Sequence, residues 1–186
     1  MLRVPTTSRR RVLAVVMLVP IALLALGGRA AGEDAAAAAL KAAFLFNFVK
    51  FAQWPADAVP SGAALVLCVL GDDQVATTLE GVTKGRPIDS HELVVKRVNA
   101  DSMVKNCQMV YLSGLGAKQS ATLTQSLIDT SALTVSDLPG FAHAGGIINF
   151  VVEDGKLRFV INAEAAARAR LRLSSKLLSL ASIVKD

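Results

Sequence analysis

A continuous run of apolar residues at 63–70 is the feature that most restricts how this chain can fold. Such a run is typical of a strand that is buried on both faces, as in a parallel sheet. Further strands are predicted at 93–98, 109–112 and 133–135, and residues 117–128 have the pattern of a helix. Strands that alternate with helices predict an α/β domain: a three-layer α/β/α, Rossmann-like arrangement with a mostly parallel sheet.

The two ends of the domain are predicted to be helical, with a β-hairpin before the second helix. Residues 35–54 are rich in Ala, Leu and Phe and predict a helix that Pro55 stops. On a helical wheel its buried face carries Leu40, Phe44, Phe48 and Phe51. An Asp-Gly turn at 154–155 between two apolar runs predicts the C-terminal hairpin. After Asn162, a last helix is predicted to continue to about residue 184.

The first thirty residues have the pattern of a secretory signal peptide. Arg9, Arg10 and Arg11 precede a mostly apolar run over 12–26, and small residues at 28 and 30 supply a cleavage site. The run is shorter than a typical membrane span, which disfavours the alternative of an uncleaved anchor. We therefore expect residues 1–30 to be removed and residues 31–186 to form one periplasmic domain. The arginines leave both the general secretory and the twin-arginine route open.

Removal of the signal changes the charge balance of the chain. Five of the 20 Lys and Arg residues lie within residues 1–30. All 15 Asp and Glu residues lie after residue 30. Residues 31–186 therefore carry 15 groups of each sign and no net charge. Because nucleic-acid binding requires an excess of basic side chains, we expect no nucleic-acid partner.

The exported part contains two cysteines, Cys68 and Cys107. In an oxidising compartment a single pair favours a disulfide, and its loop of about 40 residues would stabilise the fold by roughly 4 kcal/mol. Two buried free thiols are the alternative. Since two Cys and two His lie scattered along the chain, we expect no metal site.

Sequence motifs of known catalytic chemistry are absent. The chain has neither glycine-rich phosphate-binding pattern and no Gly-x-Ser-x-Gly elbow, and we expect no catalytic residues and no cofactor. Polar pairs at 71–72, 113–114 and 136–137 follow predicted strands, at the edge where open sheets bind ligands. Turns and helix caps need the same residue types, so both interpretations stay open.

Two sets of side chains are candidates for a partner-binding surface. The first set is spaced i, i+4, i+8 on the predicted first helix, opposite its buried face: Phe46, Lys50 and Trp54. The second has the same i, i+4, i+8 spacing on the predicted last helix and would suit an acidic partner: Arg168, Arg172 and Lys176. The alternatives are that other elements cover the aromatic residues and that the basic residues form an ordinary solvated face.

Six blocks of the sequence, in order, resemble the YfiR-like family of periplasmic proteins, over about residues 38–184. The first, Phe-Asn-Phe-Val-Lys-Phe-Ala-Gln-Trp-Pro at 46–55, is similar to the family's aromatic–Trp–Pro signature. The others lie at 67–71, 133–137, 145–150, 161–162 with the alanines that follow, and 173–181.

The resemblance implies a Rossmann-like, often dimeric domain that is not an enzyme. It implies that the chain represses a membrane-bound diguanylate cyclase by binding the periplasmic domain of that cyclase, and that an outer-membrane lipoprotein sequesters it under envelope or redox stress. It also places a disulfide at Cys68 and Cys107. Some members have a second cysteine pair near the C-terminal hairpin, which this chain lacks, so redox sensing by a second bridge is not expected.

The leading hypothesis is therefore a periplasmic regulatory protein that acts by protein–protein contact and lowers cyclic-di-GMP signalling, and with it biofilm formation. One alternative is a periplasmic binding domain for a small solute, which would use the crevice at the carboxyl ends of the strands. The other is a hydrolase whose residues come together from distant parts of the chain.

Export of the chain is directly testable. Because the small residues at 28 and 30 mark the cleavage site, intact-mass measurement on the periplasmic fraction should find a mature N-terminus between Ala30 and Glu33. Recovery of the full precursor from the cytoplasm as the working form would contradict this expectation.

Overall fold

The computed structural model describes residues 27–99, 104–128 and 130–184. The chain divides into two compact units, residues 1–37 and 38–186. Most of the predicted signal peptide, residues 1–26, lies outside the described residues, and residues 27–30 belong to helix α1 (Gly27–Lys50). Among the helices that the structure describes, none is long and apolar enough to cross a membrane.

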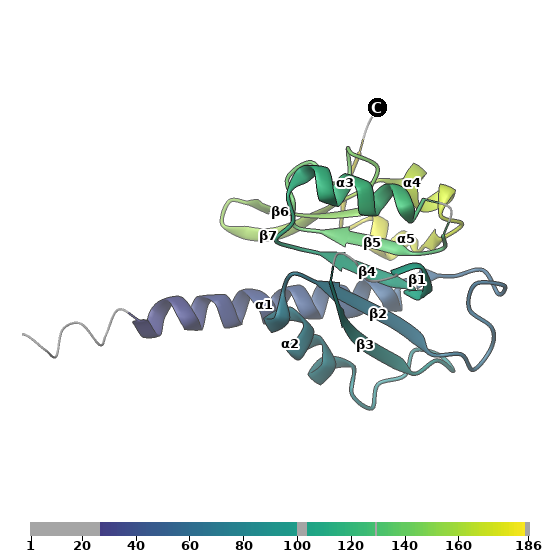
Figure 1. Ribbon diagram of the computed structural model, residues 1–186, viewed down its shortest axis with the longest axis horizontal. Helices are drawn as coiled ribbons and strands as arrows, with labels where there is room; N and C mark the ends of the chain where they lie inside the picture. Colours follow the sequence, from purple (N-terminus) through teal and green to yellow (C-terminus); the bar gives the residue numbers. More distant parts are fainter. Residues whose placement is uncertain (1–26, 100–103, 129, 185–186) are drawn as a thin grey trace, which may run out of the picture. The chain divides into compact units, whose positions relative to one another are not determined.

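A seven-stranded sheet forms the centre of the second unit (Figure 1). Its strands are β2 (Leu65–Leu70), β3 (Leu93–Val98), β4 (Met109–Leu112), β5 (Leu133–Ser136), β6 (Ile148–Glu153), β7 (Lys156–Ile161) and β9 (Ser182–Ile183). They lie in the order β3-β2-β4-β5-β6-β7-β9. The first five run parallel, β7 is antiparallel to β6, and β9 is parallel to β7. The predicted Rossmann-like α/β sheet with a C-terminal hairpin is confirmed.

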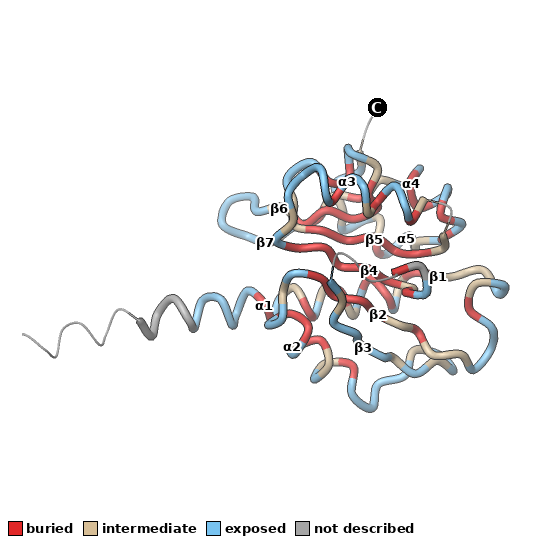
Figure 2. Tube along the Cα trace, in the orientation of Figure 1, coloured by how far each residue is buried: buried red, intermediate tan, exposed pale blue. Residues whose placement is uncertain are grey.

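The apolar runs occupy the middle of the sheet, where both faces are covered. Figure 2 shows β2, β4 and β5 buried along most of their length. Successive side chains of a strand point to opposite faces, so β2 contributes to two separate clusters. Leu67 and Val69 belong to the first cluster, and Cys68 and Leu70 belong to the second. Such strands are mostly apolar, and the buried polar residues of β5, Thr134 and Ser136, both form hydrogen bonds through their hydroxyl groups.

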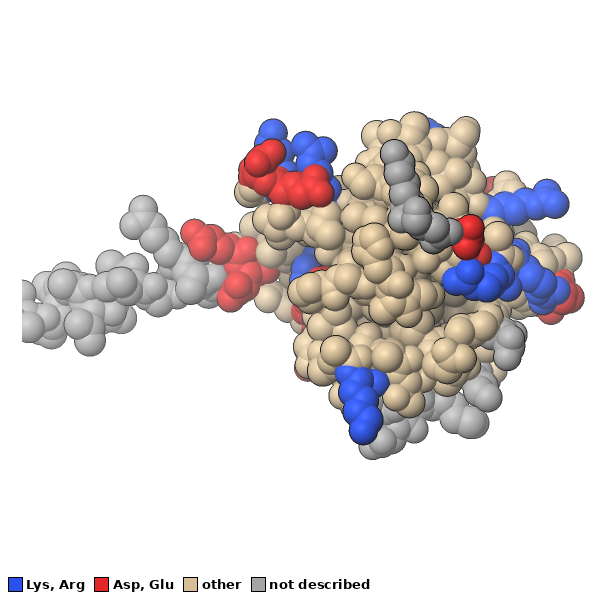
Figure 3. All heavy atoms as spheres, turned by 90° about the horizontal axis from the view of Figure 1, so that it is seen from above, with Lys and Arg blue, Asp and Glu red and all other residues tan. Residues whose placement is uncertain are grey.

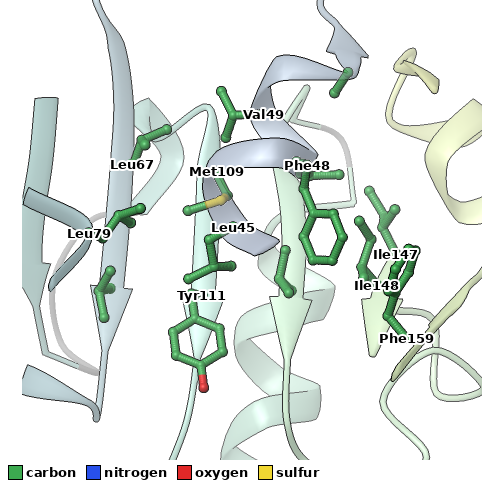
Figure 4. Packing of buried hydrophobic residues seen from close by; sticks show 14 of the residues in the cluster. Leu45, Phe48, Val49, Leu67, Leu79, Met109, Tyr111, Ile147, Ile148 and Phe159 are labelled. Atoms are coloured by element: carbon green, nitrogen blue, oxygen red, sulfur yellow. The ribbon is translucent and has the colours of Figure 1, made fainter. Parts of the chain in front are cut away.

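Helices cover both faces of the sheet and complete the three layers. The first cluster includes side chains of α1 and of α2 (Asp73–Thr83). Figure 4 shows Leu45, Phe48 and Val49 of α1 directed at the strands. The second cluster lies on the opposite face, under α3 (Ala117–Ser126) and a 3₁₀ turn, η1 (Val104–Asn106).

A disulfide joins Cys68 of β2 to Cys107, just before β4. The two Cα atoms are 5.9 Å apart, and the residues are 1% and 6% exposed. Because β2 and β4 are parallel neighbours, the bridge cross-links adjacent strands inside the second cluster. The predicted pairing is confirmed, and the alternative of two free thiols is wrong.

The first helix is shorter at its C-terminal end than predicted. It ends at Lys50, and Ala52–Gln53 form a short strand, β1, followed by Trp54. Pro55 disfavours a helical conformation for the residue before it, which is one reason for the early end. Phe46, Lys50 and Trp54 are therefore not an i, i+4, i+8 row on one helix. Leu40 is also 46% exposed, because the buried stripe passes instead through Ala38, Ala42, Leu45 and Val49.

The predicted last helix is wrong: the segment forms four short elements. These are α4 (Ala163–Arg168), β8 (Arg172–Leu173), α5 (Ser175–Leu178) and β9. Arg170 ends α4 with a φ of 58°. The N–H of Leu171 donates to the carbonyl of Ala166, and the N–H of Arg170 donates to that of Ala167, which is a Schellman motif. Arg168, Arg172 and Lys176 therefore do not form a ladder on one helix.

The contrast between Phe48 and Leu40 tests the packing of α1. Phe48 is fully buried, with ring centroids 4.9 Å from Phe159 and 5.6 Å from Phe150. Phe48→Ala should therefore lower the free energy of unfolding by about 3–5 kcal/mol, measured by urea denaturation. Leu40→Ala is the matched control and should change it by less than about 1 kcal/mol, since Leu40 is exposed. Equal losses for the two variants would contradict this packing.

Candidate functional site

A two-stranded ribbon brings the two predicted surface sets together. Strand β1 pairs antiparallel with β8, so that Ala52 lies opposite Leu173 and Gln53 lies opposite Arg172. The N–H of Ser174 donates to the carbonyl of Phe51 and extends the pairing. Residues near position 50 and residues near position 172 are therefore neighbours, although they are far apart in the sequence.

Two lysines from the two segments lie over one aromatic ring. The Nζ atoms of Lys50 and Lys176 are 5.9 Å and 5.4 Å from the ring centroid of Phe51. Both lysines are exposed and Phe51 is half-buried. A cation near an aromatic ring is weakly attracted to it when solvent has access, so the lysines remain free to meet a partner.

A cavity of about 590 Å³ is formed by residues of β1 and β8 and their neighbours. It is lined by Gln53, Trp54, Pro55, Ala167, Arg170, Leu171 and Arg172. Its volume is within the range of sites that bind small molecules or the side chains of a peptide. The indole Nε1 of Trp54 is buried and has no hydrogen-bond partner among the described residues. An unpaired buried donor costs free energy, so such groups are uncommon in folded proteins.

Arg170 combines a strained backbone with an exposed ion pair at the edge of the cavity. Its φ of 58° lies in the left-handed region, which costs a residue other than glycine about 1 kcal/mol. Its Nη1 lies 2.8 Å from Oδ2 of Asp57, and its Nη2 donates to Oγ of Ser131. The hydrogen bond from Arg170 lowers the pKa of Asp57, so this carboxylate is ionised at neutral pH.

The surface is basic, although residues 31–186 carry equal numbers of basic and acidic groups. We define the β1–β8 surface as Lys50, Phe51, Gln53, Trp54, Arg170, Arg172 and Lys176. Within the described part of the chain, Lys50, Arg172 and Lys176 form no ion pair. Figure 3 shows Lys and Arg side chains gathered, with acidic groups among them, on the right of the view, the side on which α4 lies in Figure 1.

Two of the predicted surface residues lie elsewhere. Nη1 of Arg168 lies 3.8 Å from the Glu164 carboxylate on α4, and Arg168 lines a separate small cavity next to α3. Phe46 is half-buried and packs against the first core cluster. For Phe46, the alternative that other elements cover it is supported in part.

A second polar cluster lies at the carboxyl ends of the parallel strands. Oδ2 of Asp137 accepts hydrogen bonds from Lys41 at 2.6 Å, Tyr111 at 2.9 Å and Ser113 at 3.0 Å. Oδ1 of Asp72 accepts from the N–H of Val75 and caps α2. Burial, followed by the charge of Asp137, raises the pKa of Tyr111, so its hydroxyl stays protonated and donates.

This strand-end cluster is arranged as a structural network. Its polar groups satisfy one another, and the ends of β2 and β4 meet closely: a Cβ at Gly71 would lie 1.9 Å from the carbonyl oxygen of Ser113. The predicted capping role of Asp72 is confirmed. Among the described residues, no three His, Cys, Asp or Glu side chains come together as metal ligands. The crevice is therefore a weaker candidate for binding than the β1–β8 surface.

Sequence reasoning missed Asp57, Lys41, Tyr111 and the pairing of β1 with β8. One available signal was the Arg-Leu-Arg-Leu alternation at 170–173, whose period of two is typical of a strand and not of a helix. No comparable signal marks Asp57, because its partner Arg170 is 113 residues away in the sequence.

The sheet and the β1–β8 surface define an α/β domain with a surface that combines aromatic and basic side chains. A family model described as YfiR/HmsC-like matches residues 38–182, and the chain belongs to this family. No curated protein sequence matches the chain. One solved structure similar to the chain is the crystal structure of a conserved domain protein from Vibrio cholerae O1 biovar eltor str. N16961, with 12% identity and a TM-score of 0.47. The match covers 70% of this chain and 57% of that one, so the chain spans little more than half of its length.

The strain at Arg170 can be measured by substitution. Arg170→Gly should leave the free energy of unfolding unchanged or raise it by up to about 1 kcal/mol, since glycine adopts the left-handed conformation without strain. The exposed ion pair with Asp57 that is lost contributes little. Arg168→Gly, at the last residue of α4, is the control and should lower the free energy by up to about 1 kcal/mol. Equal destabilisation of both variants in thermal denaturation would contradict strain at Arg170.

Proposed function

We propose that this chain is a periplasmic regulatory protein that binds the periplasmic domain of a membrane-bound diguanylate cyclase and represses it. The cyclase is held inactive by protein–protein contact, so that cyclic-di-GMP stays low. Membership of the YfiR/HmsC-like family over residues 38–182 is the observation that carries the proposal. An outer-membrane lipoprotein that sequesters the chain would release the cyclase.

The β1–β8 surface is the proposed contact with the cyclase. It combines aromatic side chains and arginines, the residue types enriched in protein–protein interfaces. Its unpaired cations favour a partner of opposite charge and would speed their encounter. The surface is built on β1 and β8 and on the ends of α1 and α4, so it needs little ordering when a partner binds.

The alternatives from other classes have less support. A solute-binding domain would need an open crevice at the strand ends, where the side chains of Asp137, Lys41, Tyr111 and Ser113 are bonded to one another. A hydrolase would need a nucleophile next to a general base. Of the described hydroxyls at this edge, that of Ser113 donates to a carboxylate already paired with Lys41.

Capture of the partner from membranes tests the proposed function. The tagged mature chain should retain a diguanylate cyclase from detergent-solubilised membranes, and mass spectrometry identifies the retained protein. Deletion of the gene that encodes this chain, the proposed repressor, should raise cellular cyclic-di-GMP. Lys50→Glu combined with Lys176→Glu should lose capture, because both cations over Phe51 are reversed. The melting temperature should be nearly unchanged, since both side chains are exposed.

A matched variant separates the surface from net charge. Lys84→Glu combined with Lys118→Glu makes the same charge change at exposed positions outside the β1–β8 surface and should retain the cyclase. If deletion left cyclic-di-GMP unchanged and no cyclase were captured, the proposed function would be wrong. If both double variants lost capture equally, the contact would lie elsewhere.

A further inference from the structure

One carboxylate of the chain already lies against the cations of the β1–β8 surface. Oδ2 of Asp57 lies 2.8 Å from Nη1 of Arg170, and the two side chains are 64% and 59% exposed. Asp57 belongs to the turn that follows Trp54 and Pro55, in which the N–H groups of Ala58 and Val59 both donate to the carbonyl of Pro55. This turn holds an acidic group beside the cavity.

The pair between Arg170 and Asp57 is easily exchanged. Solvent-exposed ion pairs contribute little to stability, because water solvates both partners almost as well when they separate. A carboxylate from another molecule can therefore replace Asp57 on Arg170 at small cost. The carboxylate of Asp57 would also repel the carboxylate of an acidic partner that approaches Arg170.

The remainder of the surface fits an acidic segment that contains an apolar side chain. Trp54, Pro55 and Leu171 give the cavity apolar walls, and Arg170 and Arg172 lie at its edge. Lys50 and Lys176 extend the positive charge over Phe51.

We propose that the cavity at the β1–β8 surface receives an acidic segment of the cyclase's periplasmic domain, with an apolar side chain against Trp54 and a carboxylate on Arg170 and Arg172. Asp57 occupies the carboxylate position in the free protein and competes with the partner. This inference rests on the proposed function for the identity of the partner. The chemistry of the segment follows from the side chains of the cavity itself.

The chain provides its own reporter for a test. Its sequence contains one tryptophan, Trp54, which lines this cavity and also a neighbouring one next to Ile88 and His91, so intrinsic fluorescence reports on the surroundings of this one side chain. The probe is a short acetylated and amidated peptide of alternating Asp and Leu, added to the mature chain at low salt. The control peptide has Asn in place of Asp. The acidic peptide should shift the emission of Trp54 in a saturable way, and added salt should weaken binding.

Three variants distinguish binding of the acidic peptide at this cavity from non-specific electrostatic attraction to the protein surface. Asp57→Asn should bind the acidic peptide about two- to fivefold more tightly, since the competing carboxylate is removed. Arg172→Gln should bind it more weakly by a similar factor. Arg168→Gln is the matched control with unchanged binding, because Arg168 is paired with Glu164 and does not line this cavity. All three substituted side chains are exposed, and circular dichroism verifies that each variant is folded.

The outcomes separate this inference from the proposed function. Three results would overturn the acidic-segment site. The first is an equal shift of the Trp54 emission with the Asn peptide. The others are that Asp57→Asn shows no emission shift with the acidic peptide, or binds it more weakly than the wild-type chain does. If the wild-type chain captures the cyclase while the peptide fails, the proposed function stands and this inference falls. Peptide binding with the expected order of the variants, but without cyclase capture, supports the site and removes the cyclase as its partner.

Discussion

The packing of Phe48 against the aromatic side chains of β6 and β7 fixes the first helix on the sheet. Its ring meets those of Phe150 and Phe159, and the neighbouring Leu45 and Val49 are equally buried. Strand β1 follows directly on this helix, so the position of β1 depends on the same packing. The β1–β8 surface therefore depends on the core for its geometry, although its own side chains are mostly exposed.

The sheet was predictable because the buried strands in its middle consist mostly of apolar residues. Strand β4, with all four residues buried, is apolar throughout. The Asp-Gly turn at 154–155 identifies the hairpin by its backbone requirement, with φ values of 50° and 69°. The tail after residue 162 was not predictable in the same way. Its alanine-rich start favours a helix, and the residue that ends α4 in a left-handed conformation is Arg170, where glycine is the usual signal.

The candidate surface was predicted in part, and for a reason that proved wrong. Helical spacing predicts two separate helix faces, one with Lys50 and Trp54 and the other with Arg172 and Lys176. The structure brings these residues together through the pairing of β1 with β8. Strand β8 has only the alternation at 170–173 as a local signal, and β1, with two residues, has no periodicity that could be recognised. Its pairing joins segments more than a hundred residues apart, which local spacing does not report. Phe46 packs against the first core cluster and Arg168 pairs with Glu164 on α4, so both lie outside the surface.

The disulfide between Cys68 and Cys107 ties the folding of this domain to a cellular compartment. The bridge lies inside the second cluster between adjacent strands, and a loop of this length adds roughly 4 kcal/mol, a large share of the stability of a typical domain. In a reducing cytoplasm the bridge does not form. For a chain exported as proposed, the precursor would lack this contribution until it had crossed the inner membrane. The native state would then be secured only in the compartment where the protein works, and a molecule retained in the cytoplasm would remain open to unfolding and proteolysis.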